Sequence, residues 1–273
     1  MLLNLKNIYK PATEAEALAL LTQRGHFPLY GGAALGRHPH PAVEAAIDLS
    51  RLGLDRAAEH GDALRLGSMM TLERVRQACA ERGEAHPLLG GLARALAEDL
   101  PETLRNTFTL GDLLLERDPQ SLTLTLLLAL DAQIAVAGAG APLSVAEWLA
   151  SGDAAWRTLV RHVSVPRGPA QATVALQKVS RTPADAPIVG AIAAAWADGT
   201  ARHTGLALCG VAPWPVAQPE AARRFDQTGD LDAALDALAL DPPDDHWGSR
   251  EYRAEMARVL TRRVLAGVAE AVK

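Results

Sequence analysis

The sequence predicts an α+β protein, and two recurring patterns support that prediction. Short apolar runs that end in glycine turns, such as the run before Gly31 and Gly32, are typical of strands. Polar caps that precede apolar residues at helical spacing, as from Thr13 to Leu21, are typical of helices. With 273 residues, of which 49% are hydrophobic, the chain is long enough to bury a large core and to form about two or three domains.

The N-terminal half alternates between expected strands and helices. It starts with an extended segment that ends at Tyr9, and Thr13 and Glu16 then have the spacing of a capping box. Gly25 is expected to end the helix that follows, and a strand then leads to Tyr30. The further elements expected in this half are strands at 64–68 and 133–137, helices at 71–82 and from residue 86 onward, and a buried apolar helix at 122–130.

Near residue 167 the composition changes. Pro166 to Pro169 is typical of a linker, and the alternating residues from Ala172 to Val179 predict a strand. The small residues of 185–197 fit either a tightly packed helix or a strand, and the choice between them stays open. The remaining expected elements are a strand at 204–211 and helices at 218–225, 230–240 and 249–271, the last with an apolar face of Met256, Val259, Leu260, Val264 and Val268.

Two glycine turns are the strongest candidates for a binding site. One runs from Tyr30 to Leu35 after an apolar strand, and the other from Thr109 to Gly111 ahead of an apolar run. Turns of this kind can leave backbone N–H groups free to face an anion. Together they could close on one diphosphate from two sides.

These turns resemble two loops of the flavin-binding (medium) subunit of molybdenum hydroxylases. That family includes the carbon monoxide dehydrogenase medium subunit and the FAD domain of xanthine dehydrogenase. Its first loop reads Ala-Gly-Gly-Thr/His-Asp/Ser-Leu and is similar to Tyr30 to Leu35, and its second reads Ile-Arg-Asn-x-x-Thr-Ile-Gly-Gly-Asn-Leu and is similar to Leu104 to Leu114. Near the C-terminus, Ser249 to Arg253 fits the family's Ser-x-x-Tyr-Arg. The likeness therefore covers nearly the full chain.

The resemblance implies an α+β architecture of two FAD-binding subdomains, the PCMH-type fold, followed by a C-terminal domain with a small antiparallel sheet and helices. The implied bounds are 1–57 and 58–165 for the two FAD-binding subdomains and 166–273 for the C-terminal domain.

The resemblance also implies which residues hold FAD, chiefly through backbone N–H groups on its diphosphate. Lys178 would meet a phosphate or the flavin edge as a point charge, although a solvated strand lysine is an equally good interpretation. No nucleophile, acid–base pair or metal is implied. The candidate cofactor-binding residues are Tyr30, Gly31, Gly32, Ala33, Ala34 and Leu35 in the first turn, Thr109, Leu110, Gly111 and Asp112 in the second, and Lys178.

The chain departs from the family pattern at the site itself. Asp112 stands where the family has a second glycine, Leu113 where it has asparagine, Leu122 where it has aspartate, and Ala33 where it has a polar residue. A carboxylate beside a diphosphate would cost roughly 1 kcal/mol in solvent and several if enclosed. If Asp112 fills the space between the two turns, the redox assignment is expected to fail.

Two functions follow. In the first, the chain is the FAD-binding electron-transfer subunit of a molybdenum hydroxylase-like oxidoreductase, and it passes electrons from an iron–sulfur partner to an external acceptor such as NAD⁺, quinone or oxygen. In the second, the fold persists without flavin and acts as an assembly or scaffolding subunit. The resemblance implies an iron–sulfur subunit and a molybdopterin-binding subunit as partners, and the apolar content also allows a homodimer.

Several other classes are disfavoured. The net charge of −5 and the mixing of acidic and basic residues argue against a nucleic-acid partner. The run Leu122–Leu130 is too short to cross a membrane, and Cys79 and Cys209 lack ligand spacing, so we expect a cytoplasmic protein with reduced thiols. His38 and His40 alternate with prolines, which favours an exposed loop and leaves a metal site as a minor alternative.

Overall fold

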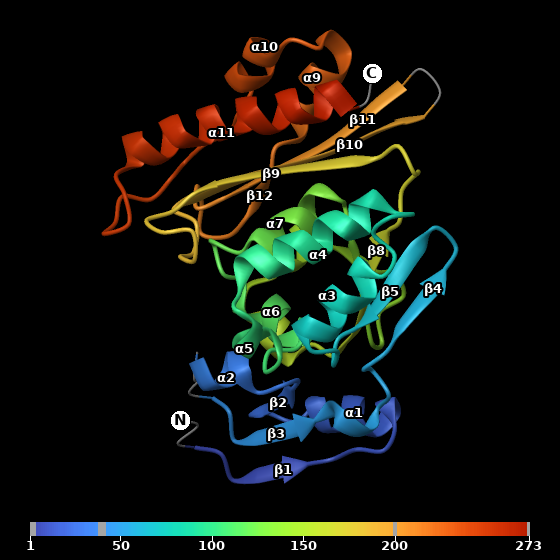
Figure 1. The fold of residues 1–273 in the computed structure, drawn as a ribbon. Coiled ribbons are helices and arrows are strands. Elements are labelled where there is room, and N and C mark those ends of the chain that lie inside the picture. The colour runs from blue at the N-terminus through green and yellow to red at the C-terminus, as the bar shows by residue number, and fades with distance from the viewer. Residues whose placement is uncertain (1–3, 38–41, 199–200, 272–273) are drawn as a thin grey trace. The chain divides into compact units, whose positions relative to one another are not determined.

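The computed structural model describes residues 4–37, 42–198 and 201–271, and these residues form two compact units (Figure 1). The N-terminal unit is assembled from 1–75, 102–116 and 133–165, and the C-terminal unit from 76–101, 117–132 and 166–273. Each unit combines helices with β-sheet, which confirms the predicted α+β class.

A three-stranded parallel sheet with the strand order β1-β3-β2 begins the N-terminal unit. Parallel strands of one sheet need crossover connections, and helix α1 lies in the connection from β1 to β2 and α2 in the connection from β2 to β3. At the start of α1 the Thr13 hydroxyl accepts from the Glu16 N–H at 3.2 Å, as predicted. The Glu16 carboxylate accepts from the Ala12 N–H at 2.9 Å, one residue earlier than the capping pattern predicts. The elements are β1 (Asn7–Tyr9), α1 (Glu14–Leu21), β2 (His26–Leu29), α2 (Ala33–Arg37), β3 (Ala45–Asp48) and the 3-10 helix η1 (Leu49–Arg51).

A five-stranded sheet with the order β4-β5-β8-β6-β7 completes the N-terminal unit. Strands β5 and β6 lie where strands were predicted, and the Thr71 hydroxyl caps the next helix by accepting from the Arg74 N–H at 3.3 Å. The elements are β4 (Ala57–His60), β5 (Ala63–Gly67), α3 (Leu72–Ala80), whose first residues belong to this unit, α5 (Glu102–Arg105), α6 (Leu110–Glu116), β6 (Gln133–Val136), β7 (Leu143–Ser144), α8 (Val145–Ala150), the 3-10 helix η2 (Gly152–Arg157) and β8 (Val160–Pro166).

A four-stranded antiparallel sheet with the order β12-β11-β10-β9 is the centre of the C-terminal unit. Helices α9 and α11 pack against one face of this sheet, and α4 and α7 against the other (Figure 1). The elements are α4 (Pro87–Asp99), α7 (Leu122–Ala129), β9 (Thr173–Val179), β10 (Val189–Asp198), β11 (Ala201–Cys209), β12 (Val216–Ala217), α9 (Pro219–Thr228), α10 (Leu231–Asp236) and α11 (Arg250–Ala271).

Two sequence expectations are resolved in this unit. Most of the small-residue segment 185–197 lies in strand β10, which starts at Val189 and pairs with β9 and β11. Its alanines at 191 and 193–195 are buried under helices on both faces. On α11, the predicted apolar residues Leu260, Val264 and Val268 are buried, whereas Met256 and Val259 are half-buried.

Helix α7 is buried along its whole length. A helix that is apolar on every side needs partners on every side, and α7 packs against α4, β10 and β11. Both α4 and α7 lie within the predicted second FAD-binding subdomain, 58–165, yet they pack with the C-terminal sheet. The compact units thus cut across the division into 1–57, 58–165 and 166–273, which stays a prediction.

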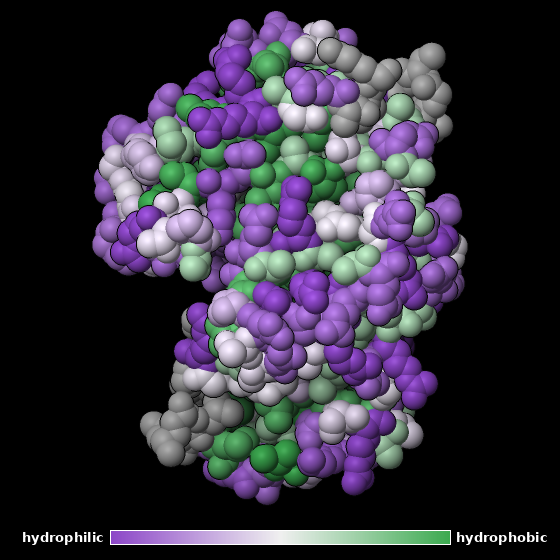
Figure 2. All heavy atoms as spheres, in the orientation of Figure 1, coloured by the Kyte–Doolittle hydropathy of each residue, from purple (hydrophilic) through white to green (hydrophobic). Residues whose placement is uncertain are grey.

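Hydrophilic side chains cover most of the visible face of each unit, with apolar residues between them (Figure 2). Within 4–37, 42–198 and 201–271, no helix combines the length and the apolar content needed to cross a membrane. Cys79 and Cys209 are buried free thiols, and burial raises the pKa of each to about 12.

One charged side chain lies in the core of the C-terminal unit. Arg253 of α11 is only 2% exposed, and its Nη1 donates to the carbonyls of Ile188 and Gly210 at 2.8 Å each. Its Nη2 donates to the Asp245 carboxylate at 2.6 Å. Because Ile188 precedes β10 and Gly210 follows β11, the guanidinium ties α11 to one end of this strand pair.

Replacing Arg253 is expected to destabilise the protein. Arg253→Met would leave two buried carbonyls without their donor and would remove the ion-pair partner of Asp245, whose carboxylate is 35% exposed and still accepts from the Trp247 N–H, so the cost should be roughly 2–5 kcal/mol. Arg250→Met is the matched control on the same helix, because Arg250 is 56% exposed and pairs with exposed Asp241, an interaction worth roughly 0–1 kcal/mol. Chemical denaturation measures both variants, and equal losses would contradict the structural role of Arg253.

Candidate functional site

The first glycine turn joins β2 to α2 and is anchored by Tyr30. The buried Tyr30 hydroxyl donates to the Thr158 carbonyl and accepts from the Val160 N–H, each at 2.8 Å. Burial raises the pKa of Tyr30, so its hydroxyl stays protonated and can make both bonds. Gly32 has a φ of +88°, a conformation that glycine adopts without strain. The turn is therefore fixed to the start of β8 independently of any ligand.

The second turn leads into α6 and is bonded to the segment that follows β5. The N–H of Leu110 donates to the Met70 carbonyl at 2.9 Å, and the N–H of Gly111 donates to the Ser68 carbonyl at 2.8 Å. Ser68 in turn donates its hydroxyl to the Val160 carbonyl at 2.6 Å. Two of the N–H groups that were expected to face a diphosphate are thus used within the chain, and Val160 anchors both turns.

The two turns approach each other so closely that only glycine fits at the contact. A Cβ added to Gly111 would lie 2.2 Å from Cδ1 of Tyr30, and one added to Gly31 would lie 2.4 Å from Oδ2 of Asp112. Cβ atoms essentially never lie closer than 3.0 Å to a non-bonded heavy atom, so a side chain at either position would force the turns apart.

The Asp112 carboxylate lies where the two turns meet. Its Oδ2 accepts from the Gly31 N–H at 2.9 Å, from the Thr109 N–H at 3.1 Å and from the Thr109 hydroxyl at 2.9 Å. Its Oδ1 accepts from the Ala34 N–H at 3.1 Å. Asp112 is 1% exposed, and these four neutral donors replace the water that it loses on burial. The structure thus brings together Gly31, Ala34 and Thr109 from the predicted set, with Asp112 as their shared acceptor.

Asp112 also caps α6. The Thr109 hydroxyl accepts from the Asp112 N–H at 3.2 Å while the Asp112 carboxylate accepts from the Thr109 N–H, which is the reciprocal pattern of a capping box. The spacing Thr109-x-x-Asp112 is visible in the sequence and could have revealed this role. The partners in the first turn lie 78 and 81 residues away and have no such signal.

Two further ion pairs hold the surroundings of the turns. Arg37 of α2 pairs with Glu116 of α6 at 3.4 Å, and Arg105 of α5 pairs with Glu73 of α3 at 2.7 Å. The Arg105–Glu73 pair is almost fully enclosed, with side chains 10% and 8% exposed. None of these four residues belongs to the predicted cofactor-binding set, because a pairing between residues distant in the chain leaves no local pattern in the sequence.

Lys178 belongs to the C-terminal unit, and its ammonium donates to the carbonyls of Glu98, Pro183 and Asp185 at 3.1 to 3.4 Å. Its charge therefore stabilises chain segments of its own unit.

Two of the positions that depart from the family pattern, Leu113 and Leu122, are buried apolar residues.

His38 and His40 lie outside the described residues. Within the described part of the chain, no cluster of three or more His, Cys, Asp or Glu residues could hold a metal ion.

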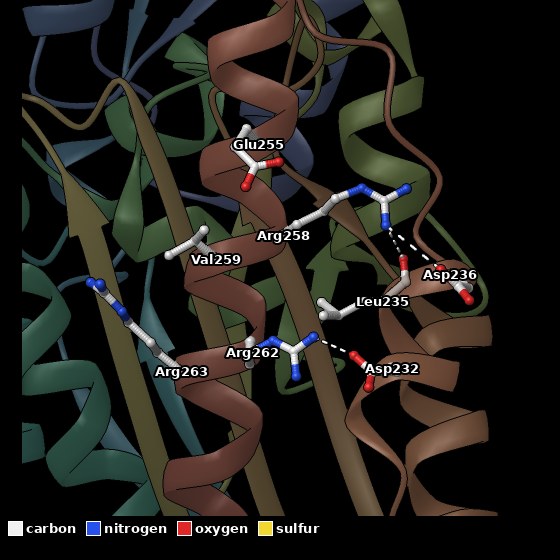
Figure 3. A pocket seen from close by; sticks show the side chains of 8 residues that line it. All are labelled: Asp232, Leu235, Asp236, Glu255, Arg258, Val259, Arg262 and Arg263. Carbon is white, nitrogen blue, oxygen red and sulfur yellow. Dashed lines mark hydrogen bonds and ion pairs between the residues drawn. The ribbon is translucent and has the colours of Figure 1, made fainter.

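A hollow of about 300 Å³ lies between α10 and α11 of the C-terminal unit (Figure 3). Arg262 pairs with Asp232 there, and Arg258 donates to the Leu235 carbonyl at 3.2 Å and lies 3.9 Å from the Asp236 carboxylate. Arginines and carboxylates thus neutralise each other across the hollow, and no function follows from it.

The fold and the paired turns define a class of protein. The chain belongs to the family described as the FAD binding domain in molybdopterin dehydrogenase, whose model matches residues 4–168. FAD is the cofactor of this family.

Solved structures and a sequence relative resemble the whole chain. A chain of the reconstituted CO dehydrogenase from Oligotropha carboxidovorans aligns with a TM-score of 0.83 and 22% identity over 97% of this chain and 98% of that one. Quinoline 2-oxidoreductase from Pseudomonas putida 86 aligns with a TM-score of 0.79 and 21% identity over 97% of both chains. The uncharacterized protein YgfM of Escherichia coli (strain K12) is 29% identical over 272 residues, 98% of each chain.

The donor set at the two turns has the chemistry of an anion site, since N–H groups from both turns converge on one negatively charged group. That group is the chain's own carboxylate. A diphosphate does not fit at these donors while Asp112 is bound to them, although the donors themselves are suitable.

The close approach of the turns predicts a sharp difference between two glycines. Gly111→Ala is expected to destabilise the protein by roughly 1–3 kcal/mol, because the new methyl group would overlap the Tyr30 ring. Gly36→Ala in α2 meets no atom within 4 Å and is expected to be neutral or stabilising by roughly 0.5–1 kcal/mol. Thermal unfolding of both variants measures the difference, and a neutral Gly111→Ala would show that the turns are not in contact.

Proposed function

We propose that the protein is the FAD-binding electron-transfer subunit of a molybdenum hydroxylase-type oxidoreductase. The observation that carries this proposal is the family match over residues 4–168. Alignment with a CO dehydrogenase chain over 97% of this chain and 98% of that one supports an assembly of the same kind. By this resemblance the partners are an iron–sulfur subunit and a molybdopterin-binding subunit, and the complex works in the cytoplasm.

FAD, when bound, supplies electron exchange between the iron–sulfur partner and an external acceptor such as NAD⁺, quinone or oxygen. The chain's own residues supply position. Tyr30 holds the first turn on β8, and the N–H groups of Leu110 and Gly111 hold the second on the segment after β5. This role needs no nucleophile and no acid–base pair.

A second candidate function is a flavin-free assembly subunit, and a specific observation favours it. The Asp112 carboxylate fills the contact between the two turns and uses the donors that a diphosphate would need, which is the condition under which the redox assignment was expected to fail. Leu113 and Leu122 also place buried apolar side chains where the family has polar ones. Both candidates retain the same fold and the same partners.

Saturation with FAD distinguishes the two functions. We expect the purified full-length protein, mixed with excess FAD and then separated from free ligand, to retain flavin whose visible bands are bleached by dithionite. FMN is the control, because it lacks the diphosphate and adenosine and is expected to be lost on separation. A protein that stays colourless even at saturating FAD contradicts the electron-transfer function and supports the assembly role.

A further inference from the structure

The N-terminal unit contains an internal anion at the point where an external one would bind. The carboxylate of Asp112 accepts from main-chain N–H groups on both turns, Gly31 and Ala34 on the first and Thr109 on the second. Each N–H has one hydrogen to donate, so none of these groups can serve a second acceptor at full strength. The acceptor that uses them carries a negative charge and is almost completely enclosed, at 1% exposure.

The space between the two turns is occupied, and the N–H donors that face it are already used. A methyl group on Gly31 would already lie 2.4 Å from the carboxylate oxygen, so no phosphate oxygen can enter between them. The two helices that begin at the turns, α2 and α6, are joined by the Arg37–Glu116 ion pair, in which Nη1 of Arg37 lies 3.4 Å from Oε1 of Glu116. The Asp112 carboxylate and the Arg37–Glu116 pair therefore hold the two turns together.

We propose that Asp112 is an internal competitor for the diphosphate site: its carboxylate and the diphosphate of FAD bind the same main-chain donors and exclude each other. This inference rests on the proposed function, because the family's FAD site is taken to lie at these two turns. Binding then requires the carboxylate to leave Gly31 and Ala34. When only a fraction of the protein molecules is in the binding-competent state, the apparent affinity for the ligand is reduced by that fraction.

The test compares Asp112→Gly, which restores the family's second glycine, with the wild-type chain. If the Asp112 carboxylate is bound to the turns in roughly nine-tenths or more of the wild-type molecules, the Kd for FAD should be at least about tenfold lower in the variant. Isothermal titration calorimetry at fixed ionic strength measures the Kd of FAD, of ADP and of inorganic pyrophosphate for each full-length protein. Equal Kd values for wild type and Asp112→Gly would overturn the inference.

A matched control separates competition from helix capping. Glu147 is the acidic member of the capping box of α8 in the same unit, and Glu147→Gly removes a cap of the same kind without touching the two turns. We expect Glu147→Gly to bind FAD as the wild type does. A similar gain in both variants would mean that loosening of the unit, and not release of the donors, increases the affinity, and would also overturn the inference.

A second substitution protects the test against loss of folding. Asp112→Asn keeps the side-chain shape and removes the charge, and it should also bind pyrophosphate more tightly than wild type. Backbone amide NMR shifts of Gly31 and Ala34 on adding pyrophosphate should appear in both variants and be absent in wild type at the same concentration. Unchanged amide shifts in both folded variants would overturn the inference.

The three ligands also separate this inference from the proposed function. Tighter binding of ADP and pyrophosphate by Asp112→Gly, with no FAD binding by either protein, supports the competition and contradicts the electron-transfer function. Tight FAD binding by the wild type, unchanged in Asp112→Gly, supports that function and overturns the competition.

Discussion

The N-terminal unit depends on one buried carboxylate that holds together two turns far apart in the chain. Asp112 exchanges water for four neutral donors, and such an exchange is favourable only when every lost hydrogen bond is replaced. The close contact at Gly31 and Gly111 accompanies it, because a Cβ added at either glycine would lie only 2.2 to 2.4 Å from an atom of the facing turn. Tyr30 and Ser68 then tie both turns to Val160, so the five-stranded sheet supports the whole arrangement.

Local signals predicted much of the fold. The caps at Thr13 and Thr71, the strand that ends at Gly67 and the glycine turn at Gly32 each depend on neighbours within a few residues, and such patterns can be read from sequence alone. Strand β10 was left open because alanine and glycine give no periodic pattern. Its identity comes from pairing with β9 and β11, which lie elsewhere in the chain.

The candidate site was predictable only in part. The two turns, and the presence of an unexpected carboxylate at Asp112, were apparent in the sequence. The effect of that carboxylate was expected to be repulsion of a diphosphate, whereas the structure shows it as the ligand of the turns themselves. Arg253 shows the same limit, since its acceptors at Ile188 and Gly210 are brought to it only by the packed sheet. Partners separated by 43 residues or more leave no local pattern.

The interleaving of the two units has a consequence for synthesis and for shortened chains. Helix α7 leaves the ribosome before strands β10 and β11, which cover it, so its eight buried residues must wait for partners that are made later. A chain cut after residue 168 would retain the whole family match yet lose the sheet under α4 and α7, and the exposed leucines would favour aggregation. The segment that matches the family model and the two compact units are therefore not the same parts of this polypeptide.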